Sequence, residues 1–457
     1  MRVAGLLGAN ALILVAGLGL LPWLRVARSW RELVARSGIG YLCGLVLTGI
    51  VAAHLALVHV AFGWIAQSLL AAVLAVSAAW HLRGTERPTW TRPHWAAFVA
   101  AAAFAALIAE YARAFAVAPL NRYDAWAIWA LKGHALYAFG WADPTVFAGT
   151  SYRFANLDYP LLLPSLEAVD FRAMGAFDTR LLHLQFLLLL VAGLAALGTV
   201  FAGRVHPAVV WSVVAAIAVA PAVFDQLLTA YADIPLALVF AVGTAAAGRW
   251  LVTNERWALA VATLCFAGAL LTKNEGTLFA VAAFVGLLVV AYRRWRALAA
   301  AAAVDVALLL PWKLYVRVHH LEDINYKLTD SFDVNHIRGR LGVGPIAFRT
   351  LAGEMVDPRQ WGLLMPLFLA LVLAGLFLGA RRLAIFGALA GGLSWLGLSW
   401  IYVISHFEYS SYLDSTKERV VASVVLGSAG LMPLLASEVW VSVRDRDRLR
   451  DGAARTP

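Results

Sequence analysis

The sequence is poor in charge and in cysteine. Only 14% of its 457 residues are charged and 62% are hydrophobic, whereas about 25% charged residues are usual in a soluble domain. This composition excludes an ordinary soluble enzyme and a disordered chain. The two cysteines, Cys43 and Cys265, both fall within apolar runs, which excludes a disulfide scaffold and gives no basis for a zinc or redox site. A polytopic membrane protein remains.

Several sequence signatures are absent as well. The chain has no Walker A loop, no Rossmann fingerprint and no H-E-x-x-H motif, and no alternating ten-residue segments of the kind that build a membrane β-barrel. The first apolar stretch is not followed by a small-residue cleavage site, so we expect a span there rather than a cleavable signal. The net charge is +10, but many of the cations lie in short segments between apolar runs, so nucleic acid is not an expected partner.

The apolar runs predict an all-α polytopic membrane protein with about 13 transmembrane helices, because a backbone in lipid must satisfy its own hydrogen bonds. The predicted spans are residues 3–22, 38–59, 61–80, 96–118, 180–201, 207–223, 232–250, 257–272, 276–292, 297–314, 362–380, 383–404 and 420–440. Three spans form an N-terminal unit (1–94), which precedes a membrane core (95–440) and a basic tail (441–457).

Arginines gather on one side of this arrangement. They occupy the short loops at 25–36, 83–92, 293–296 and 381–382, and also the tail. The positive-inside rule makes that side cytoplasmic, so we expect a multi-pass protein of the plasma (inner) membrane with its N-terminus outside and its C-terminus inside. The two long loops, 119–179 and 313–361, and most of the acidic residues then lie outside. This asymmetry predicts chemistry or binding at the outer surface of the membrane.

The first outer loop offers two candidate segments. Asp124 precedes a run with helical apolar spacing that begins at Trp126, which predicts a short amphipathic helix in the membrane interface. Asp124 could cap this helix or present a functional carboxylate. Lys132, two turns further on, could snorkel to lipid headgroups or bind a lipid phosphate. Asp158 and Tyr159 stand in a proline-rich stretch that predicts a rigid turn.

Two more segments lie at predicted helix ends. Asp233 precedes Pro235 at the start of a span, where an N-cap is one explanation and a functional carboxylate is the other. Lys273 and Glu275 belong to a tight turn between two spans. A turn requires Gly and Asn, but it does not require Lys and Glu at membrane depth.

The last segment opens the final span. Ser415–Glu418 has the spacing of a capping box, and it contains Lys417. Arg419 then enters the apolar run, where a lone cation is costly unless it pairs with an acid or binds an anion. Two weaker candidates are the polar stretch 319–323, which looks more like a solvated loop than a metal site, and Asp305 near the middle of a span.

The order and shared sidedness of these segments resemble the GT-C superfamily, integral membrane glycosyltransferases that take a sugar from a polyprenyl-phosphate donor. The closest likeness is to bacterial members related to the protein O-mannosyltransferases and the lipid A aminoarabinose transferases. The resemblance covers about residues 95–440, and the matching segments are 123–132, 158–160, 232–236, 272–276 and 415–419. Two features depart from the family pattern: three spans precede the span that leads into the first outer loop, where one is usual, and Ala125 replaces a frequent adjacent Glu.

The resemblance implies an inverting transfer of sugar from a polyprenyl-phosphate donor to a glycan, lipid or protein acceptor at the outer face. Asp124 is the expected base. The expected ligands of the donor phosphate are Lys132, Lys273 and Arg419. The residues expected to contact the acceptor or to orient the others are Asp158, Tyr159, Asp233, Glu275 and Lys417. No cofactor is predicted, no metal ligands are assigned, and metal dependence stays open. A transporter or flippase for a lipid-linked saccharide is the alternative, and a non-catalytic partner of a glycan assembly complex is a third possibility.

Overall fold

The protein is an all-α polytopic membrane protein. The computed structural model describes residues 1–89 and 95–453, and within these ranges every named element is a helix. Arg92, which belongs to one of the predicted basic loops, and residues 454–457 of the basic tail lie outside the described residues. The predicted fold class is therefore confirmed at this level.

Nine stretches of helix in the described ranges are long and apolar enough to cross a membrane. They are α1 (Arg2–Leu20), α3 (Ser37–Leu57), α4 (Trp64–His81), α5 (Trp95–Val117), α9 (Thr179–Val200), α12 (Asp233–Thr253), α14 (Glu275–Ala291) joined to α15 (Trp295–Val318), α20 (Arg381–Ile404), and α21 (Tyr409–Val420) joined to α22 (Ala422–Ala453). Helices α10 (Pro207–Ala218) and α11 (Pro221–Leu228) bend by 50° at their break, and the pair makes a tenth if it is counted as one span. Two further apolar helices are shorter, α13 (Arg256–Thr272) and α19 (Leu364–Leu378).

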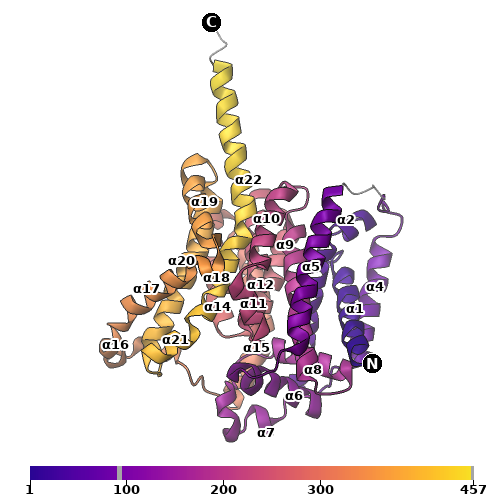
Figure 1. The fold of residues 1–457 in the computed structure, drawn as a ribbon, viewed down its shortest axis with the longest axis vertical. Helices are drawn as coiled ribbons and strands as arrows, with labels where there is room; N and C mark the ends of the chain where they lie inside the picture. Colours follow the sequence, from indigo (N-terminus) through magenta and orange to yellow (C-terminus); the bar gives the residue numbers. More distant parts are fainter. Residues whose placement is uncertain (90–94, 454–457) are drawn as a thin grey trace.

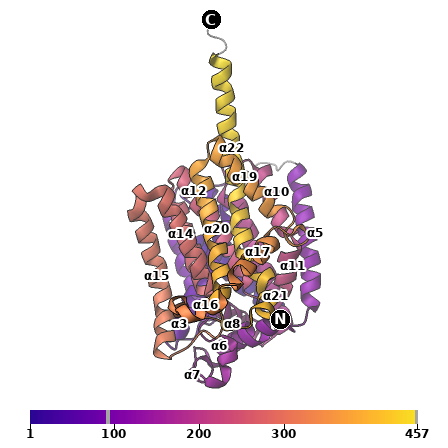
Figure 2. The same ribbon diagram turned by 90° about the vertical axis from the view of Figure 1, so that its left-hand side faces the viewer.

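Each predicted span coincides with one of these helices, but the number of crossings stays a prediction. The main difference concerns α14 and α15, which form one apolar stretch of 44 residues. Lys313, towards the end of α15, donates a hydrogen bond of 3.3 Å to the side-chain oxygen of Asn274, just before α14. The chain therefore returns to the side from which α14 started, and the two helices run antiparallel (Figure 2).

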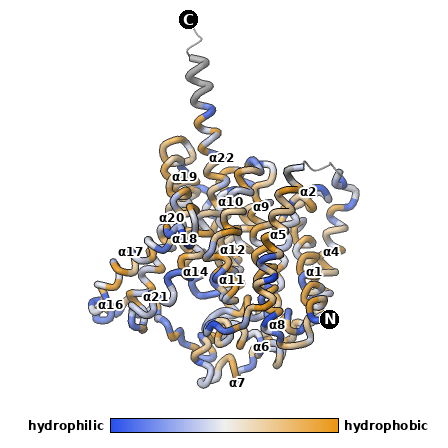
Figure 3. Tube along the Cα trace, viewed as in Figure 1, coloured by the Kyte–Doolittle hydropathy of each residue, from blue (hydrophilic) through white to orange (hydrophobic). Residues whose placement is uncertain are grey.

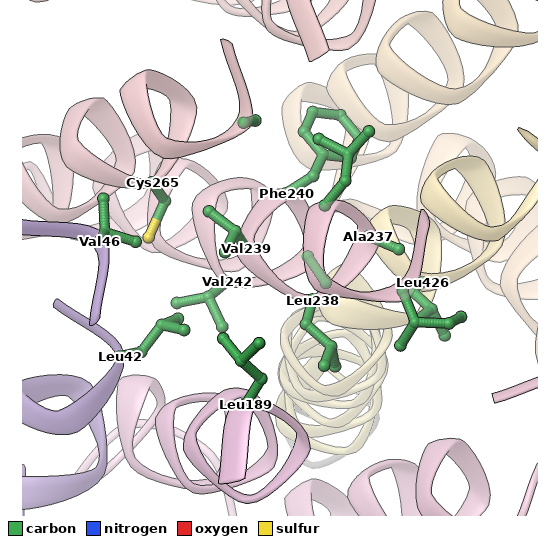
Figure 4. Close-up of a cluster of buried hydrophobic side chains, with 14 of the residues drawn as sticks. Leu42, Val46, Leu189, Ala237, Leu238, Val239, Phe240, Val242, Cys265 and Leu426 are labelled. Atoms are coloured by element: carbon green, nitrogen blue, oxygen red, sulfur yellow. The ribbon is translucent and has the colours of Figure 1, made fainter. Parts of the chain in front are cut away.

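Helix α12 lies at the centre of the bundle. Figure 4 shows its side chains packed among Leu42 of α3, Cys265 of α13 and Leu426 of α22. Cys265 is a buried free thiol. A Cβ atom added to Gly430 of α22 would lie 2.5 Å from the backbone oxygen of Ala241. Helices in lipid associate by close packing at small residues, and this contact shows how α22 approaches the central helix.

The two long loops are largely helical. The first contains η1 (Ala125–Trp129), α6 (Ala130–Phe139), α7 (Pro144–Phe147), η2 (Thr150–Ala155) and α8 (Leu162–Met174). The second contains η4 (Leu328–Phe332), α16 (Val334–Arg340), α17 (Val343–Met355) and α18 (Pro358–Trp361). The remaining short helices are α2 (Trp30–Ala35) and η3 (Tyr292–Arg294).

The helices of the first long loop define one end of the molecule. Figure 1 shows α6, α7 and α8 gathered at the end that carries the N-terminus, while α22 extends from the opposite end. Most of the bundle is hydrophobic in Figure 3, whereas α16 and the neighbouring α21 carry hydrophilic stretches. Helix α8 packs against α1, α3 and α6, so the first long loop is partly built into the bundle and does not simply cover it.

Candidate functional site

A cavity of about 580 Å³ lies at this end of the bundle. Its walls come from the start of the first loop, the segment 154–159, the turn between α13 and α14, residues 324–325, and α21 with the residues beside it. Five of the residues singled out from the sequence line it: Asp124, Tyr159, Lys273, Glu275 and Arg419. Folding thus brings together four segments that are far apart in the chain.

Asp124 and Arg419 form an ion pair across the cavity. Their Oδ2 and Nη1 atoms are 2.5 Å apart, although the residues are separated by 295 positions in the chain. The guanidinium also lies 4.6 Å from the ring centre of Tyr231. Asp124 makes no capping hydrogen bond to the helix that follows it, so the N-cap explanation is wrong. Its carboxylate is directed to the cation instead.

The position of Arg419 also differs from the prediction. It lies near the end of α21, which begins at Tyr409 and not at the predicted capping box. Glu408 caps this helix, because its carboxylate accepts hydrogen bonds from the backbone N–H groups of Ser410 and Ser411. The capping role predicted for Ser415–Glu418 is therefore wrong. Arg419 is carried into the cavity by a polar helix of its own, ahead of the apolar α22.

Lys273 is held between two carboxylates in the break between α13 and α14. Its Nζ lies 2.9 Å from Asp233 Oδ1 and 3.2 Å from Glu275 Oε1. Burial lowers the pKa of Lys273, but the two carboxylates outweigh burial and raise the pKa above its ordinary value. Asp233 makes no capping hydrogen bond at the start of α12, so of its two explanations the N-cap is excluded. The second oxygen of Glu275 is buried and has no hydrogen-bond partner among the described residues.

Aromatic rings and one amide form the wall beside Lys273. The ring of Tyr159 stacks on that of Trp129, with ring centres 5.7 Å apart, and lies 5.9 Å from the Lys273 ammonium. The amide of Asn325 donates a hydrogen bond of 3.2 Å to the Tyr159 hydroxyl. The backbone oxygen of Asn325 in turn accepts from His406 N. This wall is therefore fixed by Asn325, a residue of the second long loop that is not among the residues predicted from the sequence.

Asp158 lies behind the cavity and not in its wall. One carboxylate oxygen accepts a hydrogen bond from the amide of Asn274, which also reaches Asp323 at 3.5 Å. The backbone oxygen of Asp158 accepts from the indole of Trp312 at 3.0 Å. Burial raises the pKa of Asp158, and burial together with the charge of Asp158 raises the pKa of Asp323 to about 7. These two acids support the turn that carries Lys273.

Lys132, an expected phosphate ligand, and Lys417, expected near the acceptor, do not line the cavity. Lys132 is fully buried, its Nζ donates to the backbone oxygen of Asn156 at 2.5 Å, and it does not line the cavity. Burial lowers the pKa of Lys132 to about 7. Lys132 is buried because α6 packs tightly on α8. A Cβ atom added to Gly133 of α6 would lie 2.6 Å from the Glu167 carboxylate of α8. Lys417 pairs with the exposed Asp414 at 3.1 Å, outside the cavity.

The polar stretch 319–323 lines a second cavity of about 470 Å³, together with Arg153 and His406. In the part of the chain that the structure describes, no three histidine, cysteine or acidic side chains are placed so that they could hold a metal ion. We therefore assign no metal ligands.

The main cavity thus combines one Arg–Asp pair, one Lys held by two acids, a tyrosine wall and an amide. This set can bind an anion through its cations and accept a proton through its carboxylates.

The chain was also compared with known proteins. No family model matches it, and no curated protein or solved structure is recognisably similar to it.

Proposed function

We propose that the protein is a membrane glycosyltransferase that transfers a sugar from a polyprenyl-phosphate donor to an acceptor hydroxyl at the outer face of the plasma membrane. The observation that carries the proposal is the contact between Asp124 and Arg419 in a cavity that Lys273 and Glu275 also line. A phosphate leaving group requires a cation where its charge develops, and an attacking hydroxyl requires a carboxylate base. Both groups stand together in one cavity at an end of the bundle.

The ion pair between Asp124 and Arg419 suggests an order for the steps of the transfer. The donor phosphate competes with Asp124 for the guanidinium of Arg419, which can grip two phosphate oxygens at once. The released carboxylate then accepts the proton of the acceptor hydroxyl. The acceptor oxygen forms a bond to the anomeric carbon while the bond from that carbon to the phosphate oxygen breaks. Polyprenyl phosphate leaves with the bonding electrons, and the anomeric centre inverts in this single displacement.

Glu275 is a second candidate for the base. It lines the same cavity, and one of its carboxylate oxygens has no partner among the described residues. Asp233 is less suited to this role, because it does not line the cavity and its carboxylate is bound to Lys273. In the proposal Asp233 and Glu275 hold Lys273 in its charged form beside the donor phosphate, and Tyr159 packs against the sugar.

The test is to incubate the purified protein with a panel of polyprenyl-phosphate sugars and simple glycan, lipid and peptide acceptors. We expect polyprenyl phosphate and a glycosylated acceptor to form in equal amounts for at least one pair. Movement of a lipid-linked saccharide across a proteoliposome membrane without its cleavage would support the transporter instead. Asp305 favours that alternative, because it is buried within α15 and neither carboxylate oxygen has a partner among the described residues.

The outer location can be tested separately. Single cysteines placed next to Arg294 and next to Asp330, in a background without Cys43 and Cys265, are expected to react with an impermeant reagent from opposite sides of the membrane. The reason is that arginine-rich loops remain on the cytoplasmic side. Labelling of both positions from outside in sealed cells would contradict the orientation and the proposed location of the cavity.

A further inference from the structure

An apolar groove lies on the bundle surface between α13 and α15. It has a volume of about 730 Å³. Its α15 side is formed by residues at helical spacing, Ala297, Ala300, Ala301, Val304 and Leu308, and its α13 side includes Leu259 and Leu264. Alanines on α15 leave room that larger side chains would fill. Helix α15 stands at the edge of the bundle (Figure 2). Ala297, Ala300 and Val304 of the groove are exposed, so in a membrane this groove is open to lipid.

The length of the groove matches one leaflet of a bilayer. A helix rises about 1.5 Å per residue, so the stretch from Ala297 to Leu308 covers roughly 17 Å. The hydrocarbon core of a bilayer is about 30 Å thick. The groove therefore extends from one membrane surface to about the middle. An acyl chain of a phospholipid has this reach, whereas a polyprenyl chain is much longer.

Arginines surround the surface end of the groove. Arg256 and Arg294 line it, and Arg294 also lines an adjoining cavity of about 400 Å³ together with Arg293 and Arg382. We call these four residues the arginine cluster. The guanidinium of Arg294 lies 5.3 Å from the ring centre of Trp250. The cluster stands at the η3 end of α15, away from the candidate site, because Lys313 near the other end of α15 contacts Asn274.

The cluster carries a charge of one sign. Among the described residues, none of its four arginines forms an ion pair with an acid. The carboxylate of Glu255, next to Arg256 in the chain, is bound by Arg249 at 2.6 Å. Guanidinium groups bind phosphate oxygens in pairs, and basic pockets between membrane helices bind anionic lipid headgroups. Arg293 and Arg294 each donate a hydrogen bond to a neutral oxygen, the Tyr292 hydroxyl at 3.2 Å and the Trp250 backbone oxygen at 3.5 Å. Among the described residues the cluster lacks an anionic partner, which a phosphate group can supply.

We propose that the groove and the arginine cluster together bind an anionic glycerophospholipid from the leaflet on this side of the membrane. One acyl chain lies between α13 and α15, and the phosphate contacts Arg256 and Arg294. The acyl chain of a zwitterionic lipid fits the groove equally well. Its headgroup carries a positive charge, however, which is unfavourable beside the arginine cluster. The donor lipid binds at the opposite end of the bundle in the function proposed above. The lipid site stands on different residues and does not depend on that function.

The experiment is native mass spectrometry of the delipidated, full-length protein titrated with phosphatidylglycerol, phosphatidylcholine or diacylglycerol. We expect phosphatidylglycerol to bind most tightly. A basic residue near an anionic headgroup contributes about 1 kcal/mol, so the double variant Arg256→Gln/Arg294→Gln is expected to bind phosphatidylglycerol roughly thirtyfold more weakly. Its affinity for phosphatidylcholine should change little, because the groove remains.

Two further variants test the contributions of the headgroup and of the acyl chain separately. Ala300→Trp fills the groove on a lipid-facing position and is expected to weaken both phospholipids. Arg83→Gln/Arg87→Gln removes the same charge at the same end of the bundle but outside the groove, and should bind like the wild type. Equal binding of the two phospholipids to the wild type, or equal losses in the two double variants, would overturn the headgroup assignment. Unchanged binding in Ala300→Trp would overturn the acyl-chain assignment. Monodisperse elution of each variant serves as the folding control.

Discussion

The two ends of the bundle use cations in opposite ways. In the cavity, Arg419 and Lys273 are shielded from solvent and each contacts at least one carboxylate. In the arginine cluster, Arg293 and Arg382 are exposed and have no acidic partner among the described residues. A buried cation without a counter-charge is costly, so the cavity cations must have internal partners. The cluster cations can use water and lipid headgroups.

This difference indicates where function depends on individual side chains. A paired, buried charge is held in one geometry and can be exchanged for a substrate charge, as we propose for Asp124 and the donor phosphate. An exposed cluster acts through its total charge, so the loss of one member is partly compensated by the others. Single substitutions should therefore have large effects in the cavity and small effects in the cluster.

The largest effect is expected from Asp124→Asn. The substitution keeps the size of the side chain but removes the base, so turnover should fall by roughly 10²–10⁴-fold. Donor binding should be kept or strengthened, because the amide no longer competes with the phosphate for Arg419. Single-turnover rates and donor affinity measure this split. Asp414→Asn, an exposed acid outside the cavity, is the matched control. If Asp124→Asn kept wild-type turnover and Glu275→Gln lost most of its turnover, Glu275 would be the base.

Arg419→Ala should weaken donor binding and also slow the transfer, each by roughly 10-fold or more, because charge on the phosphate grows in the transition state. Arg419→Lys should recover only part of the loss, since an ammonium cannot grip two oxygens as a guanidinium does. Donor affinity and single-turnover rate in both variants provide the measurement, and Arg338→Ala on the exposed face of α16 is the control. A well-folded Arg419→Ala protein with normal affinity would show that this arginine only holds Asp124.

Lys273→Ala tests the comparison through stability. It leaves Asp233 and Glu275 without their shared cation, and the loss of one partner of a buried pair costs about 3–5 kcal/mol. Lys273→Met combined with Asp233→Asn should restore part of this stability, because fewer buried charges are left unpaired. Arg382→Gln in the arginine cluster should change stability by only about 0.5 kcal/mol. Thermal unfolding in detergent measures all three, and similar losses in Lys273→Ala and Arg382→Gln would remove the distinction between the two ends.

Much of this arrangement could be predicted from the sequence. Apolar runs fix the helical class because lipid leaves the backbone no other partner, and charges beside such runs single out Asp124, Lys273 and Arg419 because their burial is costly. The pairing of Asp124 with Arg419 could not be predicted, since it depends on how α21 folds back. The burial of Lys132 depends on the packing of α6 against α8. Asn325 lies in a loop without periodicity, so no local pattern identifies it.

At the cavity end, the smallest effect is expected from Asp323, which lies behind the cavity. Its folded-state pKa of about 7 is above the value of about 3.9 usual in an unfolded chain. The folded protein therefore holds a proton that the unfolded chain releases, and stability is lost as the pH rises from about 4 to about 7. Asp323→Asn removes this titration but keeps the side-chain oxygen that accepts from the backbone N–H groups of Asn325 and Tyr326.

The melting temperature of Asp323→Asn should accordingly fall less between pH 5 and pH 8 than that of the wild type, by on the order of 2–4 °C. Part of the pH dependence should remain, because the pKa of Asp158 is raised as well. Glu408→Gln is the control: backbone and side-chain hydrogen bonds from Ser411 and Ser410 lower the pKa of Glu408 to about 2, so its contribution changes only below the pH range of the measurement. Identical pH profiles for the wild type and Asp323→Asn would show that Asp323 is already ionised in the folded protein at pH 5.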